Sequence, residues 1–199
     1  MKLYWSPQTR SSTVLWMLEE TGLACERVLV DIRSGAQRAD WYRAINPMLK
    51  VPALVDGEAT MAETAAICAY LADVAPQANL APAIGDPARG RYLHYLVFAT
   101  ACIEPAIAQI FTKMEIPSGS AGWGSAERVF DVLDGELRKG PWILGDRFSA
   151  ADVMIGSGLH FCVAAFKLVP PRPSFTAYLD RCYARPAWQR AQAIDAAGV

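Results

Sequence analysis

The fold of the first part of the chain is decided by residues 51–61, Val-Pro-Ala-Leu-Val-Asp-Gly-Glu-Ala-Thr-Met. Asp56-Gly57 separates two short runs that carry apolar residues, and an Asp-Gly pair in that setting is a strong signal for a β-hairpin. Pro52 fits the start of a strand, where its missing N–H breaks no ladder hydrogen bond. We therefore predict an antiparallel hairpin over this stretch.

Strand and helix patterns alternate on either side of this hairpin. Short strands are predicted at 2–5 and 27–30, and helices at 14–20, 41–44 and 64–72. Gly22 stands just past the first helix, where glycine commonly ends a helix. The order is βαβαββα, in which a crossover helix joins a parallel strand pair and the hairpin adds antiparallel strands. This predicts an α/β domain with a mixed four-stranded sheet over residues 1–76.

A proline-rich stretch separates this domain from the rest of the chain. Residues 75–88 carry three prolines and a glycine, a composition typical of a linker. Beyond them, five segments have the apolar spacing of helices, at 88–114, 125–138, 150–166, 174–184 and 187–196. We predict a linker over residues 77–86 and an all-α helical bundle domain over residues 87–199.

Composition places the chain among ordinary globular proteins. Hydrophobic residues make up 53% of it and charged residues 20%, and the net charge is −1, without the dense Lys/Arg cluster of a nucleic-acid binder. The first residues lack the apolar core of a secretory signal, and the longest mainly apolar stretch, 153–166, is too short to span a bilayer. Five scattered cysteines form neither a CxxC pair nor a metal-ligand spacing. We expect a cytoplasmic protein without a metal site, a membrane segment or a nucleic-acid partner.

Three blocks of sequence resemble the cytosolic glutathione S-transferase family. The first is residues 46–54, Asn-Pro-Met-Leu-Lys-Val-Pro-Ala-Leu, which departs from the family motif at Leu49, where the family has glycine. The second is Glu63-Thr64 at the start of a helix. The third is residues 148–152, Phe-Ser-Ala-Ala-Asp, similar to the capping motif of the core helix in the family's C-terminal domain. The resemblance implies a thioredoxin-like first domain that binds glutathione and a helical domain that receives the second substrate.

The implied glutathione-binding residues are Lys50, Val51, Pro52, Glu63 and Thr64. In the family the bond between Val51 and Pro52 is cis, which turns the Val51 backbone outward to pair with the tripeptide as a strand would. An ordinary trans proline is the alternative. Thr64 would hold the γ-glutamyl carboxylate at a helix N-terminus, and Glu63 would hold the ammonium group. Capping of its own helix is the alternative role of Thr64.

The loop before the first helix is where the resemblance places activation of the glutathione thiol. In the family this loop holds a catalytic tyrosine, serine or cysteine, and here Arg10 stands where one bacterial subgroup has its cysteine. We predict Ser11 first and Thr9 second as hydroxyl donors, with Arg10 as a positive neighbour. A helix-capping role for Ser11 is the alternative. Weaker candidates are Tyr4, Ser6 and Ser12. Because residues 1–24 contain no cysteine, thiol-disulfide reductase chemistry is disfavoured.

The second substrate is expected in an apolar pocket lined by Trp5, Phe111, Met114 and Trp123. Side chains of these types are equally compatible with simple core packing. The predicted function is a glutathione S-transferase that uses glutathione as a co-substrate rather than a tightly bound cofactor. Its thiolate would attack small hydrophobic electrophiles in detoxification, with glutathione peroxidase activity as a second reaction. A non-catalytic glutathione-binding carrier or interaction protein is the alternative, and the resemblance implies a homodimer.

Two other features receive structural interpretations. Ser149 and Asp152 have the spacing of a capping box before an apolar run, and we predict that they cap a helix rather than form part of a hydrolase site. His94 and His160, the two histidines, both lie in apolar helical segments. We expect them to be core or interface residues rather than a catalytic base or a metal ligand.

Overall fold

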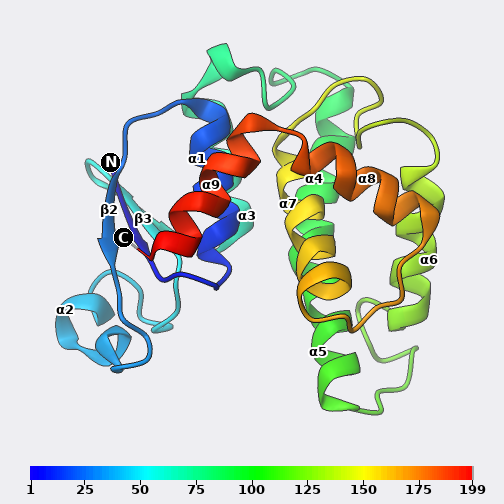
Figure 1. Cartoon of the computed structure of the whole chain (residues 1–199), viewed down its shortest axis with the longest axis horizontal. Helices are drawn as coiled ribbons and strands as arrows, with labels where there is room; N and C mark the ends of the chain where they lie inside the picture. Colours follow the sequence, from blue (N-terminus) through cyan, green and yellow to red (C-terminus); the bar gives the residue numbers. More distant parts are fainter. Residues whose placement is uncertain (199) are drawn as a thin grey trace. The chain divides into compact units, whose positions relative to one another are not determined.

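The computed structural model describes residues 1–198, which form two compact units (Figure 1). The first unit contains Met1–Ala78 together with the chain from Pro186 onward. The second unit contains Asn79–Arg185. Each unit has its own buried core, and the two are described separately below.

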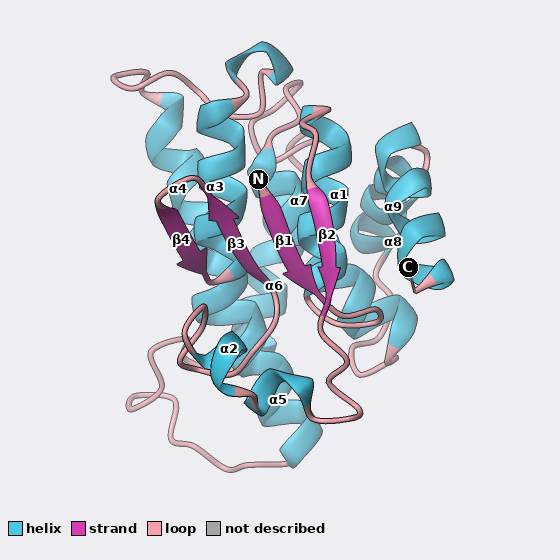
Figure 2. Cartoon of the chain, turned by 90° about the vertical axis from the view of Figure 1, so that its left-hand side faces the viewer, coloured by secondary structure: helices cyan, strands magenta, loops and turns pink. Residues whose placement is uncertain are grey.

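A mixed four-stranded sheet is the centre of the first unit. Its strands are β1 (Lys2–Trp5), β2 (Glu26–Leu29), β3 (Ala53–Asp56) and β4 (Ala59–Ala62). Their order across the sheet is β2-β1-β3-β4, and Figure 2 shows the four strands side by side. Strands β1 and β2 are parallel, and the other neighbouring pairs are antiparallel. The hairpin, the sheet and the βαβαββα order predicted from sequence are confirmed.

The helices of this unit follow the predicted order. They are α1 (Ser11–Thr21), α2 (Asp40–Arg43) and α3 (Thr64–Val74), with 3-10 turns η1 (Ala36–Arg38) and η2 (Pro76–Ala78). Helix α1 ends at Gly22, whose φ of 68° allows the left-handed turn that closes the helix. The largest side chains buried within this unit include Trp5 and Trp16, both 0% exposed.

The last helix, α9 (Pro186–Ala197), packs against α1 in the first unit. The indoles of Trp16 and Trp188 meet edge to face with ring centroids 4.7 Å apart. The Arg190 Nε donates a 2.6 Å hydrogen bond to Glu19 Oε2. The helical domain predicted over residues 87–199 included this helix, so its C-terminal limit differs from the structure. An apolar spacing predicts that a helix face is buried, but it does not name the element that buries it.

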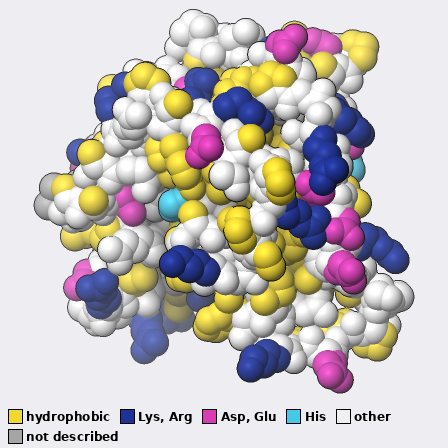
Figure 3. Space-filling view, turned by 45° about the vertical axis from the view of Figure 1, so that its right-hand side comes forward, with side chains coloured by type: hydrophobic (Ala, Val, Ile, Leu, Met, Phe, Trp, Pro, Cys, Tyr) yellow, Lys and Arg dark blue, Asp and Glu magenta, His cyan; other side chains and the backbone are white. Residues whose placement is uncertain are grey.

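The second unit is entirely helical in its regular structure. Its α-helices are α4 (Ala88–Phe98), α5 (Glu104–Thr112), α6 (Ala126–Leu137), α7 (Ala150–Leu159) and α8 (Pro173–Tyr183). Two π-helical segments, η3 (Ala99–Ile103) and η4 (His160–Ala165), continue α4 and α7. Basic and acidic side chains are interspersed with hydrophobic ones on the face shown in Figure 3, in keeping with the net charge of −1.

Helix α4, η3 and α5 form one continuous helix of 25 residues, Ala88–Thr112. By length and composition alone this helix is apolar enough to cross a bilayer, so the stretch 153–166 is not the longest apolar segment, contrary to the prediction. Core helices of soluble proteins meet the same criterion. Only 33% of its most apolar window is buried within the chain, which leaves apolar side chains of this helix uncovered.

Helix α7 is the core helix of the second unit, with all of its residues buried. The Asp152 carboxylate accepts hydrogen bonds from the Ser149 N–H at 2.9 Å and from the Ile143 N–H at 2.8 Å. The Tyr178 hydroxyl donates a third, at 2.9 Å. Burial raises the pKa of the Asp152 carboxyl, and these donors oppose the rise. The predicted capping box is therefore confirmed, and it also ties α8 and the residues before α7 to the helix start.

Candidate functional site

The backbone before β3 is held by two buried side chains. The peptide bond between Val51 and Pro52 is cis, as the family resemblance implied. The Lys50 carbonyl oxygen, one residue earlier, accepts hydrogen bonds from the Tyr42 hydroxyl at 2.6 Å and from the Asn46 Nδ2 at 2.7 Å. Tyr42 is fully buried, and burial raises the pKa of its phenol to about 12. The phenol therefore stays a proton donor throughout the neutral range.

Val51 lies just outside the sheet ladder that this anchored segment enters. The register between β1 and β3 ends at the Tyr4–Ala53 pair, two residues beyond Val51. The Val51 side chain packs on the small core cluster of Val30, Tyr42 and Ala53. This packing fixes the Val51 side chain. The Val51 backbone lies beyond the last residue pair of β1 and β3, so a bound peptide could pair with it as an added strand.

Glu63 and Thr64 open helix α3. Thr64 is the first helical residue, and Glu63 is the N-cap, with φ 67° and ψ 115° and no hydrogen bond from its side chain to the helix. A positive φ is uncommon for a residue with a Cβ, and such strained positions concentrate at ligand-binding sites. Because Glu63 rather than Thr64 occupies the cap position, the alternative role of Thr64 as an N-cap is not the geometry observed. The helix N-terminus and an exposed carboxylate stand side by side here.

The loop before α1 brings the predicted catalytic residues together in a network of hydroxyl groups. The Thr9 Oγ1 donates to the Ser6 carbonyl oxygen at 2.7 Å, and the Thr9 and Ser11 hydroxyl oxygens are 3.0 Å apart. The Ser11 Oγ also accepts from the Ser6 N–H at 3.3 Å. Ser11 is 0% exposed, whereas Thr9 and Arg10 are half-buried, and Arg10 is the N-cap of α1. Burial of the Ser11 hydroxyl favours the interpretation that Ser11 organises the loop.

Asp195 on α9 is a member of this loop network that the sequence did not predict. Its carboxylate oxygens accept from the Gln8 N–H at 3.1 and 3.2 Å, and Oδ1 accepts from the Ser12 hydroxyl at 3.0 Å. The residue is 9% exposed. A cavity of about 500 Å³ borders the same loop and is lined by Ser6, Pro7, Gln8, Thr9, Leu29, Asp31, Ile32, Arg33, Asp195, Ala196 and Gly198. No local pattern reveals a partner that lies so far along the chain.

The residues predicted to line the electrophile pocket have different surroundings. Trp5 is 0% exposed in the sheet core, so its proposed place in a pocket wall is corrected to the core alternative. Phe111 and Met114, at the end of the long helix, are 73% and 54% exposed. The indole N–H of Trp123 donates to Gln109 Oε1 at 3.0 Å. Gln109 and Met114 border one cavity of about 530 Å³, together with Glu115, Ile116 and Pro117.

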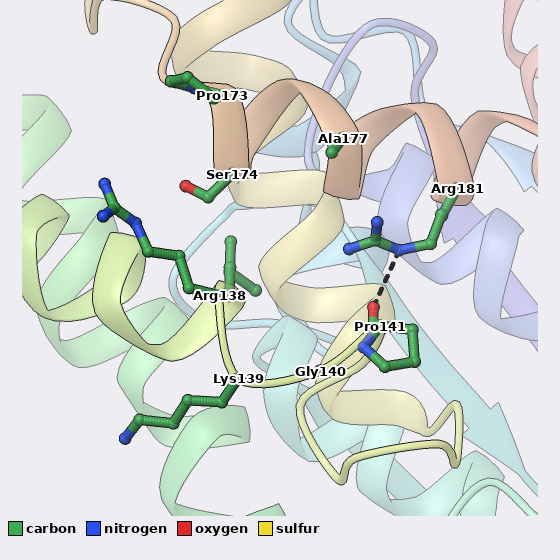
Figure 4. A pocket seen from close by; sticks show the side chains of 9 residues that line it. Arg138, Lys139, Gly140, Pro141, Pro173, Ser174, Ala177 and Arg181 are labelled. Carbon is green, nitrogen blue, oxygen red and sulfur yellow. Dashed lines mark hydrogen bonds between the residues drawn. The ribbon is translucent and has the colours of Figure 1, made fainter.

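A second cavity in the helical unit contains none of the predicted site residues. It has a volume of about 560 Å³ and lies between the end of α6 and helix α8 (Figure 4). Three basic side chains, Arg138, Lys139 and Arg181, border it. Arg138 pairs with Asp134, Lys139 pairs with Glu136, and the Arg181 Nε donates to the Pro141 carbonyl oxygen at 3.1 Å. These partners neutralise or occupy the basic groups.

No group of three or more His, Cys, Asp and Glu side chains within residues 1–198 is placed to hold a metal ion. The five cysteines are free thiols. The His160 Nδ1 lies 2.9 Å from the Tyr183 hydroxyl oxygen, at the start of the second π-helical segment.

Comparison with known proteins gives matches over both units. Residues 5–74 match the family model described as glutathione S-transferase, N-terminal domain, and residues 91–181 match glutathione S-transferase, C-terminal domain. Glutathione S-transferase 3 of Zea mays is 28% identical over 213 residues, covering 96% of this chain and 92% of that protein.

Solved structures agree with these matches. The ternary complex of BphK, a bacterial glutathione S-transferase, superposes with a TM-score of 0.83 at 32% identity, covering 98% of this chain and 100% of that one. A sphingomonad glutathione S-transferase complexed with glutathione superposes with a TM-score of 0.80 at 30% identity, covering 98% and 99%.

Proposed function

Because the chain belongs to the glutathione S-transferase family, we propose that it binds glutathione, activates it as a thiolate and transfers it to small hydrophobic electrophiles. One observation carries this proposal. The anchored Lys50–Val51 backbone and the uncapped start of α3 at Glu63 and Thr64 provide separate partners for the separate parts of an anionic tripeptide. A family relative of closely similar fold is known as a complex with glutathione.

Each part of glutathione has a proposed partner. The backbone of Val51 pairs with the cysteinyl backbone, because it extends past the last paired residues of β1 and β3. The N-terminus of α3 at Thr64 attracts the γ-glutamyl carboxylate, and the Glu63 carboxylate attracts the ammonium group. The Lys50 side chain is exposed and supplies a positive charge beside the same segment. Pro52 fixes the direction of the chain between Lys50 and β3.

Activation of the thiol is proposed at the start of α1. Lowering a thiol pKa by about two units takes roughly 2.7 kcal/mol of selective thiolate stabilisation. The helix N-terminus, Arg10 and the half-buried Thr9 all belong to the loop that would supply it. The Thr9 hydroxyl proton goes to the Ser6 carbonyl oxygen in this structure, and in the proposed complex it turns to the glutathione sulfur. Ser11, fully buried, supports Thr9 from behind through the hydroxyl pair. The thiolate sulfur then forms a bond to an electrophilic carbon, and the leaving group departs with the electron pair of the broken bond.

The electrophile is proposed to contact the end of the long helix and the loop after it. Phe111 and Met114 are exposed apolar side chains there, and Trp123 is held over Gln109 by a hydrogen bond. Reduction of hydroperoxides by the same thiolate is a second proposed reaction. In that reaction the sulfur takes the terminal peroxide oxygen, an alcohol leaves, and a second glutathione yields the disulfide and water.

A homodimer is proposed from the uncovered apolar side of α4. Leu93 and Val97, one helical turn apart, are 45% and 56% exposed. Met48, in the segment before β3, is 72% exposed. Sedimentation of the wild-type chain should give twice the monomer mass. The Val97→Glu variant should give a mass closer to that of one monomer. A cytoplasmic location follows the same family resemblance.

The alternative function is a glutathione carrier without useful turnover. Two observations favour it: Arg10 stands where one bacterial subgroup has its cysteine, and the Ser11 hydroxyl is buried in the loop. Calorimetry at millimolar glutathione tests binding, and the ultraviolet absorbance of bound thiolate against pH tests activation. A thiol pKa well below the free value of about 8.5 supports the transferase. Binding with an unchanged thiol pKa supports the carrier, and no binding contradicts both.

A further inference from the structure

The start of α1 is connected to the end of the chain by three hydrogen bonds to one carboxylate. Asp195 accepts the Gln8 N–H with both oxygens, at 3.1 and 3.2 Å, and it accepts the Ser12 hydroxyl with Oδ1 at 3.0 Å. Asp195 is 9% exposed and lies near the end of α9. Gln8 and Ser12 stand on either side of Thr9, Arg10 and Ser11. The carboxylate therefore holds both ends of the loop that carries the proposed catalytic residues.

The conformation of this loop requires such a restraint. Gln8 has a φ of 57°, in the left-handed region that a side chain with a Cβ disfavours. The loop also borders the cavity of about 500 Å³ that Asp195, Ala196 and Gly198 help to line. On this side of the loop the Gln8 N–H bonds to a carboxylate on another helix, α9. That carboxylate belongs to Asp195.

We propose that Asp195 is a positioning residue for the glutathione site, acting through the loop of residues 8–12 and resting on the proposed function above. It contacts no proposed ligand group. It keeps Thr9 and Arg10 in place at the N-terminus of α1. Helix α9 is in this way a component of the site, although its own residues lie outside the glutathione-binding set.

Two variants of Asp195 distinguish its role as a hydrogen-bond acceptor from the effect of its charge. Gln8 N and Ser12 Oγ both bond to Oδ1, so the single carbonyl oxygen of an asparagine can accept from both. In Asp195→Asn the new amide group would place an N–H near the Gln8 N–H, where Oδ2 now lies, which weakens the rescue without removing it. Asp195→Ala removes every acceptor. Ser12→Ala removes one donor and leaves the Gln8 contact in place.

A matched control exists on the same pair of helices. Arg190 also joins α9 to α1, through Glu19 Oε2 at 2.6 Å, but it does so near the C-terminal end of α1, away from the loop. Arg190→Ala therefore reports what a weaker contact between α9 and α1 does on its own. Hydrogen exchange of the Gln8 amide measures the restraint directly and needs no ligand. Calorimetry with glutathione and steady-state kinetics with a chlorinated aromatic electrophile measure the site.

For Asp195→Ala we expect exchange of the Gln8 amide about tenfold or more faster, since hydrogen bonds to charged groups are among the stronger ones. We expect a rise in the glutathione dissociation constant of similar size, on the order of tenfold. Asp195→Asn should show smaller increases in both the Gln8 exchange rate and the glutathione dissociation constant. Ser12→Ala should raise each of these quantities about threefold. Arg190→Ala should leave both quantities at the wild-type value.

Three results would overturn the inference or its premise, and they are distinguishable. Unchanged Gln8 exchange in Asp195→Ala means that the carboxylate does not hold the loop. Faster exchange with a dissociation constant and kinetics equal to those of Arg190→Ala means that the loop is held but the site does not depend on it. A wild-type chain that binds no glutathione contradicts the proposed function, while the exchange measurement still decides whether Asp195 restrains the loop. Should Asp195→Ala not fold, Asp195→Asn and Ser12→Ala give the same comparison.

Discussion

The phenol of Tyr42 donates a 2.6 Å hydrogen bond to the carbonyl oxygen of Lys50, eight residues later in the chain. Tyr42 belongs to α2, and Lys50 precedes the segment that enters β3. The bond thus joins a short helix, which has little stability of its own, to the backbone proposed to receive glutathione. Asn46 reinforces it from within the intervening turn. Loss of the Tyr42 hydroxyl should therefore affect glutathione binding more than it affects the stability of the sheet.

We predict that Tyr42→Phe lowers glutathione affinity severalfold and the free energy of unfolding by about 1 kcal/mol. The Lys50 carbonyl would keep only the Asn46 partner, and the Val51 backbone would be less well fixed. Calorimetry and urea unfolding measure the two effects. Tyr70→Phe is the matched control, because the Tyr70 hydroxyl donates to Asp56 Oδ2 at 2.9 Å elsewhere in the same unit. Equal losses of affinity in both variants would contradict the prediction.

Glu63 should show a trade between stability and binding. Its backbone has φ 67°, so Glu63→Gly should raise the free energy of unfolding by roughly 1 kcal/mol through relief of strain. The same change removes the proposed partner of the glutathione ammonium group and should weaken glutathione binding about tenfold. Glu63→Gln separates the causes, since it removes the charge and keeps the Cβ. A Gly variant that binds glutathione as tightly as wild type would refute the assigned role.

The two loop hydroxyls should differ in their effect on the thiol. Thr9→Val is expected to raise the pKa of the bound glutathione thiol by about one unit, equivalent to roughly 1.4 kcal/mol. Ser11→Ala should lower stability, because it removes a buried hydroxyl that accepts from the Ser6 N–H, with a smaller effect on the thiol pKa. Thiolate absorbance against pH and thermal unfolding give the two quantities. If Ser11→Ala raised the thiol pKa more, Ser11 would be the direct donor.

Acid should weaken the contact between α6 and α8. The Ser174 hydroxyl and the Arg138 guanidinium hold the pKa of the Asp134 carboxyl below its ordinary value of 3.8. A lowered folded-state pKa means that this contribution to stability is present above about pH 3.8 and is lost as the pH falls through the folded-state value. Asp134→Asn should therefore be less stable than wild type near neutral pH. The difference should shrink below about pH 4 in urea titrations, and a constant difference would be contrary evidence.

Local sequence signals predicted the first unit well. Asp56-Gly57 fixes a hairpin because both the turn and the flanking strands are neighbours in sequence, and Gly22 ends α1 for an equally local reason. In the second unit, the Ser149–Asp152 capping box was predicted for the same reason, because it involves only four consecutive residues. Resemblance added the cis bond before Pro52, which neither composition nor spacing contains.

Contacts between distant residues escaped prediction. Trp5 has the residue type of a pocket wall, but its place on β1 puts it in the sheet core. Asp195 meets Gln8 across nearly the whole chain, and nothing near either residue in sequence marks the pair. The apolar spacing around Trp188 predicts a buried helix face, but it does not predict that Trp188 packs against Trp16. The spacing of apolar residues predicts which face of a helix or strand is buried, but the element that covers this face is known only from the structure.

The return of α9 to the first unit has a consequence for how the chain matures during synthesis. Domains generally form as they emerge from the ribosome, the N-terminal one first. Here Trp188, which packs on Trp16, is made only after the whole of the second unit, so the nascent first unit stays incomplete until α9 has been synthesised. A fragment stopping at Ala78 would present that indole to solvent and should associate with itself or with chaperones rather than stand as an independent domain.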